Sequence, residues 1–515
     1  MTTDPDMPPI RPMEVPDEAP TDIASQVRAA AGRRPDRLAL IDGAQRLTAA
    51  EMVDRMDRCA SALRDAGLAR GDVLATLAGT TADHVVLYLG AAALGVAVAP
   101  LPVSAHPDAI ARMLDNCAPA LVLGDGSGPD LPGVRDLAAV VAGSRAHPPM
   151  PAQAFPPDLL FDIIYSSGTT GAPKGIEHDI RFRDRQVQRF IRFGLTEDAV
   201  ALFSTPLCSN TTLATLIPAL ALGATVALMG RFDAAGFLAL SQDLGVTHAM
   251  MVPVQIRRII EHPDFDRYDL RAFQVKLSTS APLPPDVVRQ VLARWPGRMV
   301  NIYGMTEGGV SAVLDCSAHP DKLHTIGRVA ANAEIRLIDE AGLEVPPGQP
   351  GEIVGRSTTV MRGYRAAPDA TRDAVWISPE GDTYIRSGDM GRCDDQGFIT
   401  LLDRRRDMII SGGFNIFAAD IEAVLARHPA LHEVAVIGVP SPRWGETPVA
   451  CVTLRAGADL SADALMDWAN ARLGKTQRLA AVWPMADLPR NAIGKILKRD
   501  LRASWVARQD EASHA

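Results

Sequence analysis

Short apolar runs that alternate with helix-like stretches constrain the fold of this chain more than any other feature. Runs such as TVALMG, VTHAMMVP, FQVKLSTSA and RMVNIYG end at glycine, proline or small residues, and helix-like stretches such as PPDVVRQVLARWP lie near them. This alternation is typical of layered α/β structure. Thr48 and Glu51 have the spacing of a capping box, which predicts a helix that begins there and runs to Ala66, with Gly67 as its stop.

The length of 515 residues exceeds what one hydrophobic core usually supports, so at least two domains are expected. We predict a large α/β domain over 21–403, in which 333–403 form a β-rich module with hairpins around glycine-containing turns. A cluster of three arginines at 404–406 is the predicted hinge. Residues 407–505 are predicted to form a small, mobile α+β domain. The acidic, proline-rich residues 1–20 are expected to be a disordered tail.

Charge and composition exclude several classes of function. The formal net charge is −9 and no basic stripe occurs, so the sequence does not support nucleic-acid binding. No run of about 18 apolar residues occurs, so no stable membrane insertion is expected. The six cysteines are scattered and form no C-x-x-C pair, which favours a reducing cytoplasm over a zinc site or a disulfide framework.

The strongest local signal is the segment YSSGTTGAPKG, which follows the apolar run LLFDII. A strand that ends in serine, glycine and threonine leaves backbone N–H groups and hydroxyls free to surround an anion, and Lys174 adds a positive charge. The order Pro173-Lys174-Gly175 differs from the Gly-Lys-Ser/Thr ending of a Walker A loop, so the segment does not indicate a P-loop NTPase. The simpler alternative is a flexible surface loop.

This segment resembles the phosphate-binding loop of the acyl-adenylate-forming superfamily, which includes acyl- and aryl-CoA synthetases, luciferases and peptide-synthetase adenylation domains. Further motifs follow in the order of that family: YGMTE, SGD, DRRRDMIISGG and PRNAIGK. Five motifs in order identify the chain as a member. The resemblance implies that the acid and ATP form an acyl-adenylate and pyrophosphate, after which coenzyme A takes the acyl group.

The resemblance also implies roles for individual residues. The implied phosphate-binding residues are Ser166, Ser167, Gly168, Thr169, Thr170, Gly171 and Lys174. The implied AMP-binding residues are Ser280, Ala281, Pro282, Asn301, Ile302, Tyr303, Thr306, Asp389 and Arg404. The implied catalytic residues are Lys174, Thr306, Glu307 and Lys495, with Glu307 also holding Mg²⁺. Mg²⁺ takes few protein carboxylates and completes its shell with phosphate oxygens and water, which suits a single glutamate.

The small domain is implied to carry the hinge and the CoA contacts. Arg406 matches the hinge position, and the implied CoA-binding residues are Ser411, Gly412, Gly413, Trp444, Lys475 and Arg478. The alternative for Trp444 is a packing role within the small domain. Lys498 and Arg499, which follow Lys495, are expected to be ordinary surface charges.

The acyl site departs from the pattern of the family. An aromatic residue and a histidine often follow Pro-Leu there, whereas this chain has Cys208-Ser209-Asn210. We place the acyl pocket at Ser209, Asn210, Gly304 and Val310 and expect a hydrophobic acid, either fatty or aryl. No aspartate stands nearby to pair an amine, which disfavours an α-amino acid. His178 lacks the usual Thr-His spacing and receives no role.

Two other functions stay open at this stage. One is a ligase that loads a carrier protein instead of CoA, which consumption of free CoA would distinguish. The other is a nucleotide-binding protein that has lost catalysis, which the presence of all five family motifs disfavours. The sequence identifies neither the acid nor the oligomeric state, and a homodimer stays open.

Overall fold

The computed structural model describes residues 10–14, 20–166, 173–404, 407–411, 414–441, 443–490 and 496–514. Its contacts divide the chain into two units. The first unit comprises Met1–Ile335 and Val354–Arg386, and the second comprises Arg336–Ile353 and Ser387–Ala515. The predicted hinge at 404–406 stays a prediction, because residues 405 and 406 lie outside the described ranges.

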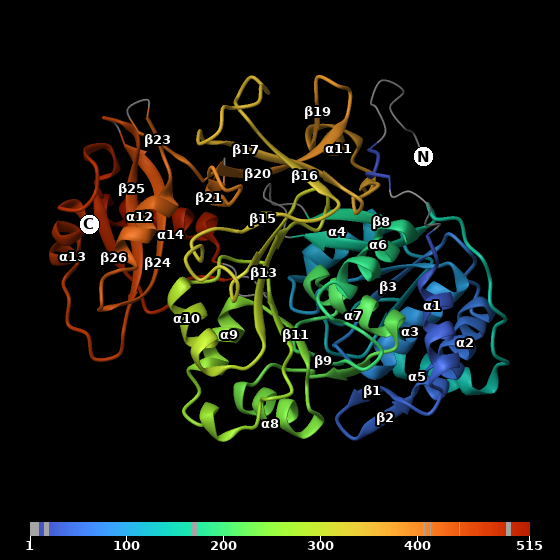
Figure 1. Ribbon diagram of the computed structural model, residues 1–515. Helices are drawn as coiled ribbons and strands as arrows, with labels where there is room; N and C mark the ends of the chain where they lie inside the picture. The colour runs from blue at the N-terminus through green and yellow to red at the C-terminus, as the bar shows by residue number, and fades with distance from the viewer. Residues whose placement is uncertain are drawn as a thin grey trace. The chain divides into compact units, whose positions relative to one another are not determined.

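A long, mostly parallel sheet forms one half of the first unit, with the order β15-β14-β13-β12-β11-β9-β10-β1-β2 in the described part of the chain (Figure 1). Its strands are β1 (Leu38–Asp42), β2 (Gln45–Thr48), β9 (Val200–Phe203), β10 (Thr225–Leu228), β11 (His248–Met251), β12 (Val275–Ser278), β13 (Arg298–Gly304), β14 (Ser311–Asp315) and β15 (Arg328–Val329). Strands β13, β12, β11, β9, β10 and β1 pair in parallel, which explains their short, continuously apolar sequences.

A second sheet in the same unit has the order β18-β8-β7-β4-β3-β5-β6 among the residues described. Its strands are β3 (Val73–Leu77), β4 (Ala97–Pro100), β5 (Leu121–Gly124), β6 (Arg135–Asp136), β7 (Leu160–Ser166), β8 (Lys174–Asp179) and β18 (Gly363–Tyr364). The predicted strand LLFDII is therefore confirmed as part of β7. Strands β7 and β8 are antiparallel, so Ser166 and Lys174 lie opposite each other at the two ends of the phosphate-loop segment.

Helices pack on these sheets and share one apolar core with both of them. The helices of this unit are α1 (Ile23–Arg33), α2 (Ala49–Asp65), α3 (Ala82–Leu94), α4 (Pro107–Cys117), α5 (Leu137–Gly143), α6 (Ile180–Ile191), α7 (Asn210–Leu222), α8 (Ala234–Leu244), α9 (Pro253–Ile260), α10 (Pro285–Arg294) and α11 (Pro368–Asp373). The capping box of α2 is confirmed: Thr48 and Glu51 exchange side chain–backbone hydrogen bonds of 2.8 and 3.2 Å. In the described ranges, no helix has the length and apolar character needed to cross a membrane.

The predicted β-rich module is a sheet of short strands. They are β16 (Ala333–Ile338), β17 (Gly351–Ser357), β19 (Val375–Ile377), β20 (Thr383–Cys393) and β21 (Ile399–Arg404). The boundary between the two units crosses β16, β17 and β20. The rest of the second unit consists of β22 (Ile409–Ser411), β23 (Phe414–Ile416), α12 (Ala418–Leu425), β24 (Leu431–Ser441), β25 (Gly445–Leu454), α13 (Ala462–Asn470), β26 (Ala481–Pro484) and α14 (Lys498–His514).

Candidate active site

The carboxyl ends of parallel strands bring the candidate residues of the first unit to one edge of the long sheet. Because β9, β12 and β13 run in the same direction, the segments 204–210, 279–282 and 304–307 leave the sheet on the same side. This edge is where ligands bind in open α/β sheets. The predicted acyl and AMP segments therefore share one location, although they are separated by as many as 100 positions in the sequence.

Tyr364 joins two of the candidate catalytic residues, and sequence reasoning did not identify it. Its hydroxyl donates a hydrogen bond of 2.8 Å to Oε1 of Glu307. The ammonium group of Lys174 lies over its ring, 4.8 Å from the centroid. Burial and the negative charge of Glu307 both raise the pKa of Tyr364, so the phenol stays protonated and donates. The side chain of Tyr364 therefore contacts both the cation of Lys174, through its ring, and the carboxylate of Glu307, through its hydroxyl.

The loop after Glu307 needs glycine at two successive positions. Gly308 and Gly309 have φ angles of +70° and +74°, in the left-handed region that glycine adopts without strain. A Cβ atom on Gly308 would lie 2.3 Å from the carbonyl oxygen of Thr359. This close packing fixes the backbone that carries Glu307, whose own carbonyl oxygen accepts a bond of 2.8 Å from the amide of Met361.

A buried polar network lies behind Thr306, and its members received no role from the sequence. Nδ1 of His178 lies 2.7 Å from Oδ1 of Asp162, and its Nε2 lies 2.8 Å from the carbonyl oxygen of Thr306, both within hydrogen-bond distance. Asp162 also accepts a hydrogen bond from the hydroxyl of Tyr88 and forms an ion pair of 2.6 Å with Arg183. His178, Asp162 and Arg183 are fully buried. We correct the sequence-based view of His178, because its ring holds the backbone of a candidate phosphate-facing residue.

The acyl-site candidates differ in accessibility. Ser209 and Asn210 are partly accessible and Gly304 is exposed, whereas Val310 is buried. Val310 immediately precedes Ser311, which pairs with Gly304 across β13 and β14. Three of the four predicted residues can therefore present atoms to a ligand, whereas the side chain of Val310 is buried.

The segment Ser280-Ala281-Pro282 has an unusual backbone at its first residue. Ser280 has a φ angle of +79°, which is uncommon for a residue with a side chain. Its hydroxyl forms a hydrogen bond of 2.6 Å with the hydroxyl of Thr211 on α7. Strained residues of this kind cluster at ligand sites, which supports the candidate role. Asn301, Ile302 and Tyr303 lie in β13 on the neighbouring strand.

The second unit carries the two candidates for ribose binding. Asp389 in β20 and Arg404 in β21 are directly opposite each other in an antiparallel pair. Ser387 helps to fix the part of β20 that carries Asp389, because its hydroxyl donates to the carbonyl oxygen of Ile353 and accepts from the amide of Asp389. Two residues fifteen positions apart in the sequence are thereby brought side by side, as joint binding of a diol would require.

Three of the described CoA candidates of the second unit lie at exposed positions, and the fourth, Ser411, is partly accessible. Trp444 is 48% exposed, with the guanidinium of Arg443 lying 4.6 Å from the centroid of its ring. Lys475 and Arg478 are also exposed, and Ser411 ends β22. The exposure of Trp444 argues against a packing role. The candidates outside the described ranges are Ser167, Gly168, Thr169, Thr170, Gly171, Arg406, Gly412, Gly413 and Lys495.

Glu307 is the residue that would hold a divalent cation. Its Oε1 accepts from Tyr364, its Oε2 has no side-chain donor among the residues that the structure describes, and the side chain is partly accessible. Within the described ranges, no group of three or more His, Cys, Asp or Glu side chains could hold a metal ion. A single carboxylate fits Mg²⁺ bound mainly through phosphate oxygens and water.

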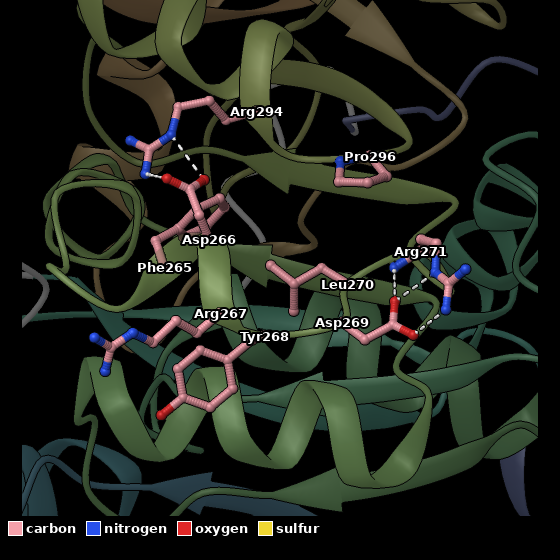
Figure 2. A pocket seen from close by; sticks show the side chains of 9 residues that line it. All are labelled: Phe265, Asp266, Arg267, Tyr268, Asp269, Leu270, Arg271, Arg294 and Pro296. Atoms are coloured by element: carbon pink, nitrogen blue, oxygen red, sulfur yellow. Dashed lines mark hydrogen bonds and ion pairs between the residues drawn. The ribbon is translucent and has the colours of Figure 1, made fainter.

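A pocket of about 380 Å³ lies away from these residues, where the chain enters β12 and β13 (Figure 2). Its arginines pair with neighbouring aspartates: Arg294 with Asp266 at 2.9 Å, and Arg271 with Asp269 at 2.6 Å. Arg267, the third arginine of the lining, pairs with Asp264 outside it at 2.7 Å, so each arginine has a carboxylate partner. It lies at the amino-terminal ends of the parallel strands, opposite the edge that carries the candidate site, and we assign it no catalytic role.

Comparison with known proteins agrees with this geometry. Residues 27–365 match the AMP-binding enzyme family, and residues 420–495 match the AMP-binding enzyme C-terminal domain. The chain is similar to feruloyl-CoA synthase from an Amycolatopsis species, with 33% identity over 91% of this chain and 96% of that protein. It is also similar to the long-chain-fatty-acid–CoA ligase FadD13 of Mycobacterium tuberculosis, with 30% identity over 90% and 94% of the two chains.

Among solved structures, the o-succinylbenzoate CoA synthetase MenE from Bacillus subtilis, in complex with the acyl-adenylate intermediate OSB-AMP, matches with a TM-score of 0.84. The match has 27% identity and covers 94% of this chain and 98% of that chain. The predicted fold, a large layered α/β domain with a β-rich module and a smaller α+β domain, is confirmed.

Proposed function

The chain belongs to the AMP-binding enzyme family, and we propose that it is an AMP-forming carboxylate–CoA ligase. In the first step the acid's carboxylate oxygen attacks the α-phosphorus of ATP, forming the acyl-adenylate and releasing pyrophosphate. In the second step the thiol of CoA attacks the acyl carbon and AMP leaves. The contacts of Tyr364 support this proposal most directly, because its ring lies under the Lys174 ammonium and its hydroxyl donates to Glu307, the proposed Mg²⁺ ligand.

Each of the proposed site residues has its own role in forming the acyl-adenylate. Lys174 and the hydroxyls of its loop would bind phosphate oxygens, and Asp389 would accept hydrogen bonds from the ribose diol. Lys495 would stabilise the charge that develops between the carboxylate and the α-phosphate. Mg²⁺ bound at Glu307 would neutralise phosphate charge. We also propose that Arg406 is the hinge at which the small domain turns between the two steps.

The exposed Trp444, Lys475 and Arg478 support CoA as the acceptor, because an aromatic face and two cations suit its adenine and phosphates. We propose a fatty or aryl acid as the substrate. A cytoplasmic setting is part of the proposal, since scattered cysteines without paired spacing are typical of reducing compartments.

Analysis of the products tests the proposed reaction. With ATP, CoA and a panel of fatty, aryl and short-chain acids, we expect AMP and pyrophosphate in equal amounts, with acyl-CoA formed from free CoA. Chromatography of the nucleotides measures this. ADP as the main product would contradict the mechanism, and acyl-adenylate without acyl-CoA would favour a carrier protein as the acceptor.

Replacing Tyr364 by phenylalanine tests the metal role of Glu307. The change removes the 2.8 Å hydrogen bond but keeps the ring under Lys174. We expect the Mg²⁺ concentration for half-maximal adenylation to rise about tenfold, the usual effect of removing a partner that orients a metal ligand. Tyr268→Phe, in the pocket at the opposite edge of the sheet, is the matched control and should leave the requirement unchanged.

A further inference from the structure

The side chain of Asn210 is held in one orientation by a group that can only donate hydrogen bonds. Nη1 of Arg183 donates to Oδ1 of Asn210 over 2.9 Å. A guanidinium has no acceptor, so the oxygen of the amide has to face Arg183. The amide nitrogen, Nδ2, therefore points away from Arg183, and the two ends of this side chain cannot be exchanged without losing the bond.

Arg183 cannot turn away to release Asn210. Its Nε donates to Asp162 over 2.9 Å, its Nη2 lies 2.6 Å from the same carboxylate, and its Nη1 also donates to Gln186 over 2.8 Å. Arg183 and Asp162 are both fully buried. Breaking a buried pair of this kind is strongly unfavourable, so the network fixes the orientation of Asn210 before any ligand arrives.

The amide nitrogen of Asn210 has no hydrogen-bond partner in the part of the chain that the structure describes. The side chain is partly accessible, as are Ser209 before it and Ala214 one helical turn later on α7, and Gly304 is exposed. The donor therefore belongs to a partly accessible side chain that is itself one of the proposed acyl-site residues. An amide N–H that a bound ligand shields from water needs an acceptor on that ligand, because a buried donor without a partner is unfavourable.

A second donor lies near Gly304, another of the proposed acyl-site residues. Arg189 lies on α6, six residues after Arg183, and its Nη2 donates to the hydroxyl of Ser311 over 2.6 Å. Ser311 is the residue opposite Gly304 in the sheet. Arg189 forms no ion pair with a carboxylate among the described residues, and it keeps accessible surface. The acyl side of this chain thus offers nitrogen donors that the protein itself does not satisfy.

We propose that Asn210 donates a hydrogen bond to an oxygen on the carbon skeleton of the acid. The substrate class is then an oxygenated acid, carrying a hydroxyl, keto or second carboxyl oxygen, and not a plain hydrocarbon acid. The inference rests on the proposed function, because it names the substrate class of that same acyl site. Arg183 and Asp162 act as positioning residues, since they reach the substrate only through Asn210.

Matched pairs of acids test the proposal by pyrophosphate release. The pairs are cinnamate with 4-hydroxycinnamate, hexanoate with 6-hydroxyhexanoate, and hexanoate with adipate. We expect the oxygenated member of at least one pair to have a kcat/KM about tenfold higher or more, the discrimination typical of a site with a fixed donor. The third pair tests whether the site prefers a second carboxylate to a neutral oxygen. Arg189→Met should lower the ratio of the kcat/KM values for adipate and hexanoate and leave the other two ratios unchanged.

Two variants of Asn210 separate the donor from the shape of the side chain. Asn210→Asp keeps the size and the contact with Arg183 but replaces the outward N–H group by an acceptor, and Asn210→Leu removes both polar atoms. In Asn210→Leu the ratio of the kcat/KM values should fall towards one in every pair that the wild type discriminates. In Asn210→Asp it should fall for the adipate pair, whereas a hydroxyl can still donate to the new carboxylate. The inference is wrong if the two acids of every pair have kcat/KM values within two-fold of each other in the wild type. It is also wrong if the ratio of these values is unchanged in both variants. In either case the proposed function stands. Absence of pyrophosphate with every acid overturns the proposed function and the inference together.

Discussion

Replacing Asp162 by asparagine is expected to lower the free energy of unfolding by about 3–5 kcal/mol, the cost of removing one partner from a buried ion pair. Asparagine keeps the volume of the side chain, so the effect comes from charge and not from a cavity. The guanidinium of Arg183, 2.6 Å from the carboxylate in the wild type, would stay buried without a counter-charge. Urea-induced unfolding at neutral pH, followed by circular dichroism, measures the change.

Tyr88→Phe is the matched control for this variant. It removes a single hydrogen bond of 2.8 Å to Asp162 and leaves the charges in place, so a loss of about 1–2 kcal/mol is expected. Equal losses in the two variants would show that the ion pair contributes nothing beyond a hydrogen bond.

The difference in unfolding free energy between the wild type and Asp162→Asn should depend on pH. Burial raises the pKa of Asp162, but the charges of Arg183 and His178 and two hydrogen bonds outweigh it and leave the pKa below its usual value. A carboxyl group with a lowered pKa stabilises the fold above about pH 4 and loses this contribution as the pH falls through the lowered value. The difference between the wild type and Asp162→Asn should therefore shrink below about pH 4.

The architecture could be predicted from the sequence because local patterns determine it. Thr48 and Glu51 form the capping box that their spacing predicts, and the apolar runs before Thr279 and Met305 are the parallel strands β12 and β13. Asp389 also lies opposite Arg404 across two strands, which agrees with the shared ribose-binding role that the family motifs suggested.

Contacts between distant segments could not be predicted in the same way. Tyr364 meets Glu307 from 57 positions away, and no local spacing records that pairing. Lys498 is another example, because it is not the surface charge that its basic surroundings suggested: it forms an ion pair of 2.9 Å with Glu422 and lies 3.9 Å from Asp403.

One signal for the buried network was present in the sequence. Asp162 is a charged residue inside the apolar run LLFDII, and a charge in such a strand needs a buried partner. His178 lies opposite it in the antiparallel pair of β7 and β8. The antiparallel pairing thus makes His178 a partner of Asp162, although the spacing of the family motif gives this histidine no role.

Replacing Lys495 by alanine is expected to slow formation of the acyl-adenylate by ~10²–10³-fold, the range for losing one preorganised electrostatic contact in a transition state. Lys495 lies outside the described residues, so this prediction rests on the match of PRNAIGK to the family motif. Its physical reason is the approach of two anions, the carboxylate and the α-phosphate, which a positioned cation makes less unfavourable. Thioester formation from supplied acyl-adenylate should change much less, because no second anion has to approach the phosphate in that step.

Single-turnover measurements of the two steps separate a catalytic lysine from a structural one. Arg499→Ala is the matched control, since Arg499 is an exposed cation four positions later whose side chain pairs with its neighbour Asp500. It should leave both rates within about two-fold, as expected for an exposed ion pair of small energy. If Lys495→Ala slows both steps equally, the side chain supports the fold of the small domain and does not act on the reacting groups. A selective loss of adenylation, with thioester formation retained, follows only if Lys495 meets the reacting carboxylate and phosphate in one step and leaves them in the next.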